Sequence, residues 1–194
     1  MKSPLFKEKI LPYLKENLTA DRLGHVMGVA YLAEKIARRH GLDPFKARMA
    51  GLLHDAAKCW KKKDLKKYAR KHRLKVPDLE QTCERQPGLL HAYVGADLVK
   101  KIFGIKDPEI LSAIAKHSLA DVRMTPFDKC VYLADLAAPG RKFPEAKVIR
   151  KMALKNLDKA FLEGLRVKLH YTVQDGCWIH PQSIRVWNSF MDEA

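Results

Sequence analysis

Apolar residues recur at helical spacing along most of this sequence. Val29, Leu32 and Ile36 follow His25 at intervals of three and four, which places them on one face of an α-helix. The segment 89–103 repeats this pattern, and no stretch alternates apolar and polar residues over more than a few positions. Because such alternation is the mark of a half-buried strand, the pattern predicts an all-α bundle.

Several predicted helices begin with a residue suited to cap them. Asp or Thr before the first turn accepts hydrogen bonds from free backbone N–H groups, and proline fits the first turn because an N–H is not needed there. Such sites are Thr19, Asp43-Pro44, Asp107-Pro108 and Thr125-Pro126. The helices that they open are predicted over about 19–40, 43–59, 107–118 and 125–137. Further helical stretches fit 4–17, 62–73, 89–103, 145–172 and 181–192.

The length of the chain, 194 residues, fits one domain with a substantial core. No internal repeat, low-complexity tract or linker divides it. We therefore predict a single domain over 1–194, with a core of about 19–140 and C-terminal helices, 145–192, packed on it.

The composition, 47% hydrophobic and 30% charged, is typical of an ordinary globular protein. No apolar run approaches the roughly 18 residues of a membrane span, and the segment MKSPLFKEKI is too charged for a signal peptide. The cysteines form no CxxC pair, so we expect reduced thiols, no thiolate zinc site and a cytoplasmic location. These cysteines are Cys59, Cys83, Cys130 and Cys177.

The net charge of +15 indicates an acidic partner, such as nucleic acid, a phosphorylated metabolite or an anionic surface. Much of the excess lies in 58–75, KCWKKKDLKKYARKHRLK. The simpler interpretation of such a run is a solvated helix face that keeps the protein soluble.

Polar residues interrupt the apolar helix faces at a few positions. In GLLHDAAK, residues 51–58, His54 and Asp55 stand side by side within an apolar run. Burial of an isolated imidazole or carboxylate is unfavourable, so the pair should have partners. The candidates lie near the inward face of four other predicted helices, at or close to a helix end, and they are His25, His91, His117 and Asp135.

Together these side chains offer imidazole and carboxylate ligands without a thiolate, a set that suits iron, manganese or zinc. Six ligands exceed what one catalytic ion takes when it also holds water. The count therefore predicts two ions, with Asp55 as a bridge between them. The other histidines are predicted to be surface or helix-end residues, and they are His40, His72, His170 and His180.

The order H…HD…H…H…D is the pattern of the HD superfamily of metal-dependent phosphohydrolases. The motifs in this chain are HVMGV from His25, GLLHDAAK, HAYVGA at 91–96, KHSLA around His117, RMTPFDKCVYLAD at 123–135 and PGRKFP at 139–144. In order and spacing they resemble the YqeK-type bacterial symmetrical bis(5′-nucleosyl)-tetraphosphatases, over about residues 10–190. The HD dipeptide alone is a weak signal, whereas the full ordered set is specific.

The resemblance implies a helical domain with a di-iron centre that splits diadenosine tetraphosphate into two ADP. Carried over to this chain, the ligands of one ion are His25, His54, Asp55 and Asp135. Those of the other ion are Asp55, His91 and His117. The implied cofactor is two divalent or mixed-valent ions, iron first, with manganese or zinc as alternatives.

The reaction implied is the attack of a metal-activated water on an inner phosphate. We assign catalytic roles to Asp55, to Lys58, which lies four residues after His54, and to Arg141 in APGR. Lys58 is predicted to share the helix face of His54 and to bind phosphate, and Arg141 is predicted to clamp a phosphate in bidentate fashion. The alternatives are that Lys58 only begins the basic run and that Arg141 caps a turn.

Two positions depart from the family pattern. Ser118-Leu119-Ala120 stands where the family has Thr-x-Gly, and Ala138 stands where it has a glutamate. Neither removes a predicted ligand, and both lie where the substrate is expected. An alternative is therefore an HD phosphohydrolase that acts on another nucleotide or phosphoanhydride.

A second alternative is a basic nucleic-acid-binding HD scaffold without turnover. The charge favours it, while the complete ligand set and the lack of an RNA-binding motif speak against it. We therefore expect a small dinucleoside polyphosphate as the partner and no membrane. The sequence leaves open the metal in the cell and the oligomeric state.

Overall fold

The computed structural model describes residues 4–191, which contain helices and connecting turns but no strand. The elements in chain order are η1 (Phe6–Ile10), α1 (Leu11–Asn17), α2 (Ala20–Arg39), α3 (Pro44–Leu53), α4 (Lys62–Lys71), α5 (Leu79–Arg85), η2 (Pro87–Leu89), α6 (Leu90–Phe103), α7 (Pro108–Lys116), α8 (Pro126–Leu136), α9 (Glu145–Ala153), α10 (Leu157–Gln174) and α11 (Pro181–Met191). The predicted all-α bundle is confirmed over these residues.

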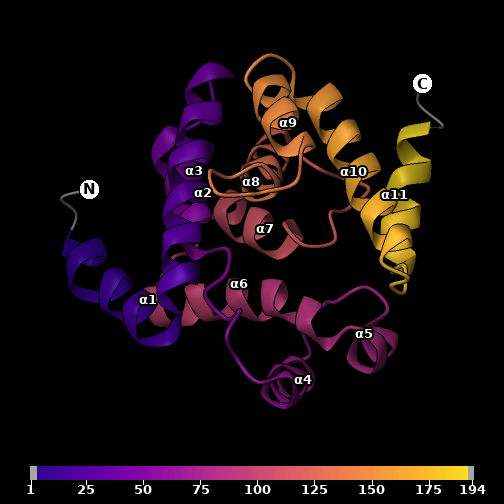
Figure 1. Cartoon of the computed structure of the whole chain (residues 1–194). Coiled ribbons are helices and arrows are strands. Elements are labelled where there is room, and N and C mark those ends of the chain that lie inside the picture. Colours follow the sequence, from indigo (N-terminus) through magenta and orange to yellow (C-terminus); the bar gives the residue numbers. More distant parts are fainter. Residues whose placement is uncertain (1–3, 192–194) are drawn as a thin grey trace.

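The helices surround a centre formed by α2, α3, α7 and α8. Helix α2 packs along α3 and against α8, and α7 contacts α3, α6 and α8. Figure 1 shows α6 crossing beneath this group, with α4 and α5 on its lower side and α9, α10 and α11 beyond α8. The ends of α3, α6, α7 and α8 approach one another beside α2. Five of the six predicted ligands lie at these ends, and His25 lies in α2.

The predicted caps form. Thr19 accepts a hydrogen bond from the Arg22 N–H, and Asp43 accepts from two N–H groups in the first turn of α3. Asp107 does the same for α7, and Thr125 forms a capping box with Asp128 at the start of α8. These caps fix where each helix enters the bundle.

The bounds of two predicted helices were wrong. The helix predicted over 43–59 ends at Leu53, after which the chain continues in tight turns. The helix predicted over 145–172 is two helices, because the Asn156 side chain caps a new helix, α10, by accepting from the Lys159 N–H. The sequence also gave no signal for α5, and position 192 of the predicted last helix lies outside the described residues.

Two buried apolar clusters lie in this framework. The larger one joins α1, α2, α3, α7, α8 and α10. The smaller one joins α4 and α5 to the outer face of α6. Helices α2 and α3 approach most closely at Gly51, where an added Cβ would lie 2.8 Å from the Cα of Ala30. The assignment of the whole chain to one domain stays a prediction.

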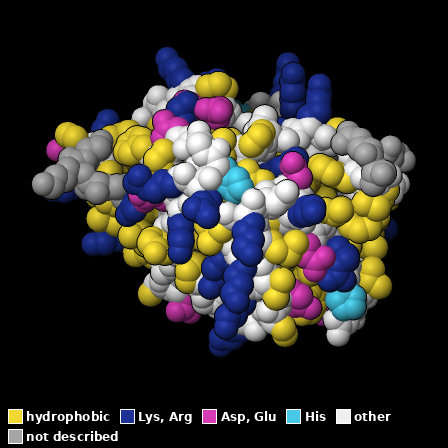
Figure 2. Space-filling view, turned by 90° about the horizontal axis from the view of Figure 1, so that it is seen from above, with side chains coloured by type: hydrophobic (Ala, Val, Ile, Leu, Met, Phe, Trp, Pro, Cys, Tyr) yellow, Lys and Arg dark blue, Asp and Glu magenta, His cyan; other side chains and the backbone are white. Residues whose placement is uncertain are grey.

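The surface is rich in basic side chains, in keeping with the net charge of +15. Figure 2 shows Lys and Arg side chains spread over the face seen from above, with fewer acidic side chains among them. In the described part of the chain, no helix combines the length and the apolar character needed to cross a bilayer.

Candidate metal centre

His54 and Asp55 follow directly on the last residue of α3. The turns after Leu53 are closed by bonds from the Ala56 N–H to the Leu53 carbonyl (3.0 Å) and from the Lys58 N–H to the Asp55 carbonyl (2.9 Å). Both side chains are almost fully buried, with 0% and 2% exposure. The sequence therefore places an imidazole and a carboxylate inside the protein, where only further polar groups can compensate them.

Asp55 lies at the middle of the centre, and its two oxygens face different groups. Oδ1 is 3.1 Å from His91 Nε2 and 3.8 Å from His117 Nε2. Oδ2 is 3.3 Å from His54 Nε2 and 3.9 Å from His25 Nε2. This arrangement is what a carboxylate that bridges two ions requires, because each oxygen has its own set of nitrogen neighbours.

Three of the histidines are oriented in the same way. The Nδ1–H of His54 donates to the carbonyl of Gly51 (2.7 Å), that of His91 to Gly88 (2.6 Å) and that of His117 to Ile114 (2.7 Å). Each bond reaches back three residues along the chain. With Nδ1 protonated, Nε2 of each ring presents a lone pair to the interior, which is the form that binds a metal.

Asp135, in the last turn of α8, completes the other side of the centre. Its Oδ1 is 2.9 Å from His25 Nε2 and 3.7 Å from His54 Nε2. The Arg141 guanidinium also donates to this oxygen (2.7 Å) and to the Asp135 backbone carbonyl (3.1 Å). Arg22 makes a similar contact on the neighbouring carboxylate, because its Nη1 donates to Asp55 Oδ2 at 2.9 Å.

The electrostatics of the centre favour ionised carboxylates. Burial alone would raise the pKa of Asp55, but the imidazoles of His54 and His91 outweigh burial and hold that pKa far below its usual range. The pKa of Asp135 is likewise well lowered against the effect of burial, first by its hydrogen bond with His25. Burial lowers the pKa of His117, and the neighbouring imidazoles of His54 and His91 lower it further. The result is a pair of anionic carboxylates beside the neutral imidazole of His117. Burial opposes a charge on His54, but Asp55 outweighs burial and raises the pKa of His54, and a bound cation would reverse this shift.

The described residues contain three groups of side chains that could hold a metal ion, and together these groups comprise all six predicted ligands. The groups are His25, His54 and Asp55; His54, His117 and Asp135; and Asp55, His91 and His117. The residues present fit a metal for a further reason: the buried His54 Nε2 has no hydrogen-bond partner. A lone pair buried without a partner is unfavourable in the free protein and is satisfied by a bound cation.

Two predicted catalytic residues also lie at the centre. Lys58 lies in the turns after α3 and not on the helix predicted to carry it, because α3 ends at Leu53. Its ammonium nitrogen is nevertheless 3.4 Å from His91 Nε2. Arg141 contacts Asp135 as described, from the loop that follows α8.

Three further polar residues near the centre were not among the predicted site residues, and they are Arg22, Ser118 and Lys168. The Ser118 hydroxyl lies 3.1 Å from His117 Nε2 and 3.4 Å from His91 Nε2. The Lys168 ammonium, from α10, donates to the Ser118 carbonyl. Burial lowers the pKa of Lys168 to about 8, with Asp135 opposing this shift. Of these three residues, only Ser118 had been marked in the sequence, as part of the departure from the family pattern at 118–120.

The remaining histidines lie elsewhere. His40 is at the C-terminal end of α2 and contacts the Ala153 carbonyl (2.7 Å), while His72 and His170 are exposed. His180 stands at a helix end as predicted, directly before α11, and it is buried, with 2% exposure. Its ring contacts the Thr82 hydroxyl (2.8 Å), which ties α11 to α5.

Comparisons with known proteins cover nearly the whole chain. Residues 22–139 match the model of the HD domain family. A protein of Bacillus subtilis named symmetrical bis(5′-nucleosyl)-tetraphosphatase is 31% identical over 94% of this chain and 96% of its own length. A protein of the same name from Halalkalibacterium halodurans is 30% identical over 95% of this chain and 97% of its own length.

A solved structure is similar over the same extent. It is described as a predicted HD superfamily hydrolase involved in NAD metabolism, from Clostridium acetobutylicum. Its TM-score is 0.90 at 31% identity, and the match covers 96% of this chain and 97% of that chain. The similarity therefore extends well beyond residues 22–139, which match the HD domain model.

Proposed function

The chain belongs to the HD-domain family, among the symmetrical bis(5′-nucleosyl)-tetraphosphatases, and on this premise we propose that it cleaves diadenosine tetraphosphate into two ADP. HD domains bind divalent metals, and this one has the side chains to hold them. The observation that carries the proposal is the convergence of four imidazoles and two carboxylates at one place in the fold. A purely structural core has no need of so many polar groups at one buried point.

We propose that two ions share Asp55. His25, His54 and Asp135 would complete one site, and His91 and His117 the other. The donor set of nitrogen and oxygen atoms without sulfur supports iron, with manganese or zinc as alternatives. When bound, two ions lower the pKa of a water molecule and neutralise charge on the attacked phosphate.

The side chains around the centre would bind and orient the phosphate chain. Arg22 and Arg141 line a hollow of about 580 Å³ beside His25. In the structure both guanidinium groups contact the carboxylates of the centre. Bound ions would neutralise these carboxylates in place of the arginines. The two arginines would then be free to bind phosphate oxygens, for which their planar groups are well suited. Lys58 would act similarly from the His91 side.

The reaction consumes one water molecule. Its oxygen forms a bond to an inner phosphorus, the bond from that phosphorus to the central bridging oxygen breaks, and this oxygen leaves with the second ADP. A symmetric cut requires the central bridging oxygen to lie at the metal centre. The phosphates on both sides of this oxygen therefore need binding groups.

The test is metal and product analysis on protein purified without oxygen. We expect about two iron ions per chain, as the two-ion site requires, and ADP as the only nucleotide product from diadenosine tetraphosphate. ATP together with AMP would mean an asymmetric cut and would overturn the proposal. Bound metal without cleavage would favour another phosphoanhydride as the substrate, because Ala120 and Ala138 depart from the family pattern where the substrate is expected.

A basic groove favours a second candidate function, the binding of nucleic acid. It lies between the ends of α2 and α9, has a volume of about 590 Å³, and is lined by Lys35, Arg38, Arg39, Lys151, Leu154 and Lys155. RNA binding that weakens steeply with salt, and that charge reversal in this groove abolishes, would support it. The groove is separate from the metal centre, so the two functions can be tested independently.

We also infer that the protein works in the cytoplasm. All four cysteines are free, and two of them, Cys59 and Cys177, are exposed. Exposed unpaired thiols are typical of reducing compartments. Fractionation of the native host, followed by detection of the chain, tests this location.

A further inference from the structure

A second cavity borders the metal centre, and its lining shares no residue with the hollow formed by Arg22 and Arg141. It has a volume of about 170 Å³, and its inner wall includes Ser118, Tyr132 and Lys168. Ser118 connects the cavity to the centre, because its hydroxyl contacts the Nε2 atoms of His91 and His117. The cavity thus adjoins the Asp55 Oδ1 side, whereas the arginine-lined hollow adjoins the Oδ2 side.

Two polar groups on the inner wall are well placed for an anion. The Tyr132 hydroxyl is buried and has no hydrogen-bond partner, which is rare for a buried polar group. The Lys168 ammonium lies 5.0 Å from the centre of the Tyr132 ring. Its hydrogen bond to the Ser118 carbonyl leaves the other two N–H groups available for a ligand.

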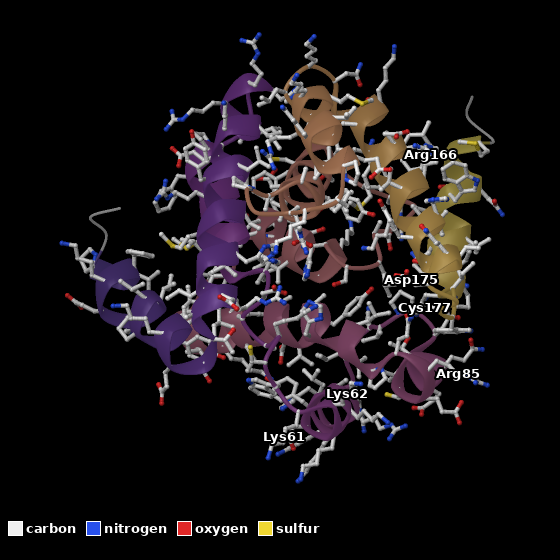
Figure 3. The ribbon with its side chains drawn as sticks, viewed as in Figure 1. Lys61, Lys62, Arg85, Arg166, Asp175 and Cys177 are labelled. Carbon is white, nitrogen blue, oxygen red and sulfur yellow. The ribbon has the colours of Figure 1, made fainter. Side chains whose placement is uncertain are left out.

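The outer part of the cavity is apolar and aromatic. Leu119, Leu165, Leu169 and Trp178 line it. An adjoining hollow of about 420 Å³ shares Gln86 and Lys168 with it and extends to the loop after α10. Figure 3 shows Asp175 and Cys177 of this loop between α10 and Arg85 of α5. The cavity and the hollow together have a volume within the range of small-molecule sites, which is roughly 300–1,000 Å³. Such sites have apolar walls and a few polar groups.

We propose that this cavity is a nucleotide subsite, in which Lys168 and the Tyr132 hydroxyl bind phosphate oxygens and the nucleoside packs against Trp178. The inference rests on the proposed function, and it explains the symmetry of the cut. A substrate with two equal halves needs cationic groups on both sides of the metal centre. Arg22 and Arg141 serve one half, and Lys168 serves the other.

The direct test is calorimetric binding of ADP and of inorganic pyrophosphate to the metal-loaded full chain. Lys168→Ala should weaken both ligands about tenfold to a hundredfold, the usual range for a hydrogen bond to a charged group. Trp178→Ala should weaken ADP and leave pyrophosphate unchanged, because pyrophosphate has no nucleoside. Lys159→Ala, an exposed position on the same helix, is the matched control and should change neither.

Tyr132→Phe keeps the proposal testable if Lys168→Ala fails to fold. The hydroxyl has no protein partner, so its removal should leave the melting temperature unchanged or higher. ADP binding should weaken about threefold to tenfold, as for one neutral hydrogen bond. If the hydroxyl were merely structural, its removal would lower the melting temperature and leave ADP binding unchanged.

Kinetics separate this subsite from the proposed function. With diadenosine tetraphosphate, Lys168→Ala should raise KM more than it lowers kcat, at unchanged metal content. Normal ADP affinity and normal KM in both Lys168→Ala and Tyr132→Phe would overturn the subsite and leave the proposed function standing. Loss of ADP binding in these variants, in a wild-type protein that does not cleave the substrate, would support the subsite and overturn the proposed function.

Discussion

The Nε2 atoms of His91 and His117 lie 3.0 Å apart, although both rings already donate through Nδ1 to backbone carbonyls. With the hydrogens on Nδ1, two lone pairs face each other across a distance at which they repel. A proton shared between the rings would relieve this repulsion, but burial lowers the pKa of both imidazoles. A metal ion that accepts both lone pairs relieves it without a buried imidazolium.

The first prediction is that removal of metal destabilises the protein. A ligand present at a hundred times its Kd stabilises the folded state by about 2.7 kcal/mol, so a chelator should lower the melting temperature by several degrees. Thermal unfolding with and without chelator measures this shift, and added Fe²⁺ or Mn²⁺ should reverse it. Asp55→Ala is the control, because chelator should not shift its melting temperature. An identical melting temperature of the wild-type protein with and without chelator would contradict the metal assignment.

The second prediction separates metal binding from phosphate binding. Asp55→Ala should abolish both metal binding and turnover, since the two oxygens of Asp55 face both pairs of imidazoles at the centre of the cluster. Lys58→Ala should retain the metal and raise KM about tenfold, as expected for one charge-assisted contact to phosphate. Metal analysis and steady-state kinetics on the two variants measure these effects. Wild-type metal content in Asp55→Ala would exclude its role as a bridge.

The six clustered side chains could be predicted from the sequence because each lies on the apolar face of a helix or directly after the end of one. Periodicity identifies such positions before the helices are assembled. The order of the motifs then identified the family. The caps at Thr19, Asp43, Asp107 and Thr125 were equally predictable, since capping depends on residues within one turn.

The remaining features depend on contacts between distant segments. Arg22 meets Asp55, 33 positions away, and Lys168 meets Ser118, 50 positions away. No local pattern encodes either contact. The end of α3 at Leu53 was missed for a similar reason: residues 54–59 have helical composition, but their position among the other helices favours turns.

The third prediction concerns the close contact between α2 and α3. A methyl group at Gly51 would lie 2.8 Å from the Ala30 Cα and 3.0 Å from its backbone nitrogen. Because these are backbone atoms, the two helices would have to separate, and Gly51→Ala should destabilise the protein by about 1–3 kcal/mol. The shift would also move the Gly51 carbonyl that orients His54, so metal affinity should fall as well.

Gly24→Ala is the matched control for this substitution. Gly24 also lies in a helix, α2, but an added Cβ there meets nothing within 4 Å. Alanine should therefore stabilise the protein by up to about 1 kcal/mol through its higher helix propensity. Urea unfolding combined with metal titration compares the two variants. Equal stability of Gly51→Ala and wild type would mean that α2 and α3 can separate without cost.

The last prediction concerns the histidine that joins α11 to α5. The Gln182 N–H donates to His180 Nδ1 (3.0 Å), so the ring hydrogen is on Nε2 and is donated to the Thr82 hydroxyl (2.8 Å). His180 therefore acts as the N-cap of α11, and it can do so only while Nδ1 is unprotonated. Burial lowers its pKa, with Asp78 opposing and Arg185 reinforcing this shift.

A lowered pKa means that the folded state favours the neutral ring, so the unfolded state binds a proton first as pH falls. The contribution of His180 to stability should be complete above its unfolded pKa of about 6.5 and should be lost as pH falls toward the lower folded value. His180→Asn isolates this effect, because asparagine also caps helices and does not titrate. Urea unfolding between about pH 7.5 and 5.5 should show wild type losing stability relative to His180→Asn. Parallel pH profiles for the two proteins would mean that the ring stays neutral for some other reason, or that its protonation is tolerated in the folded state.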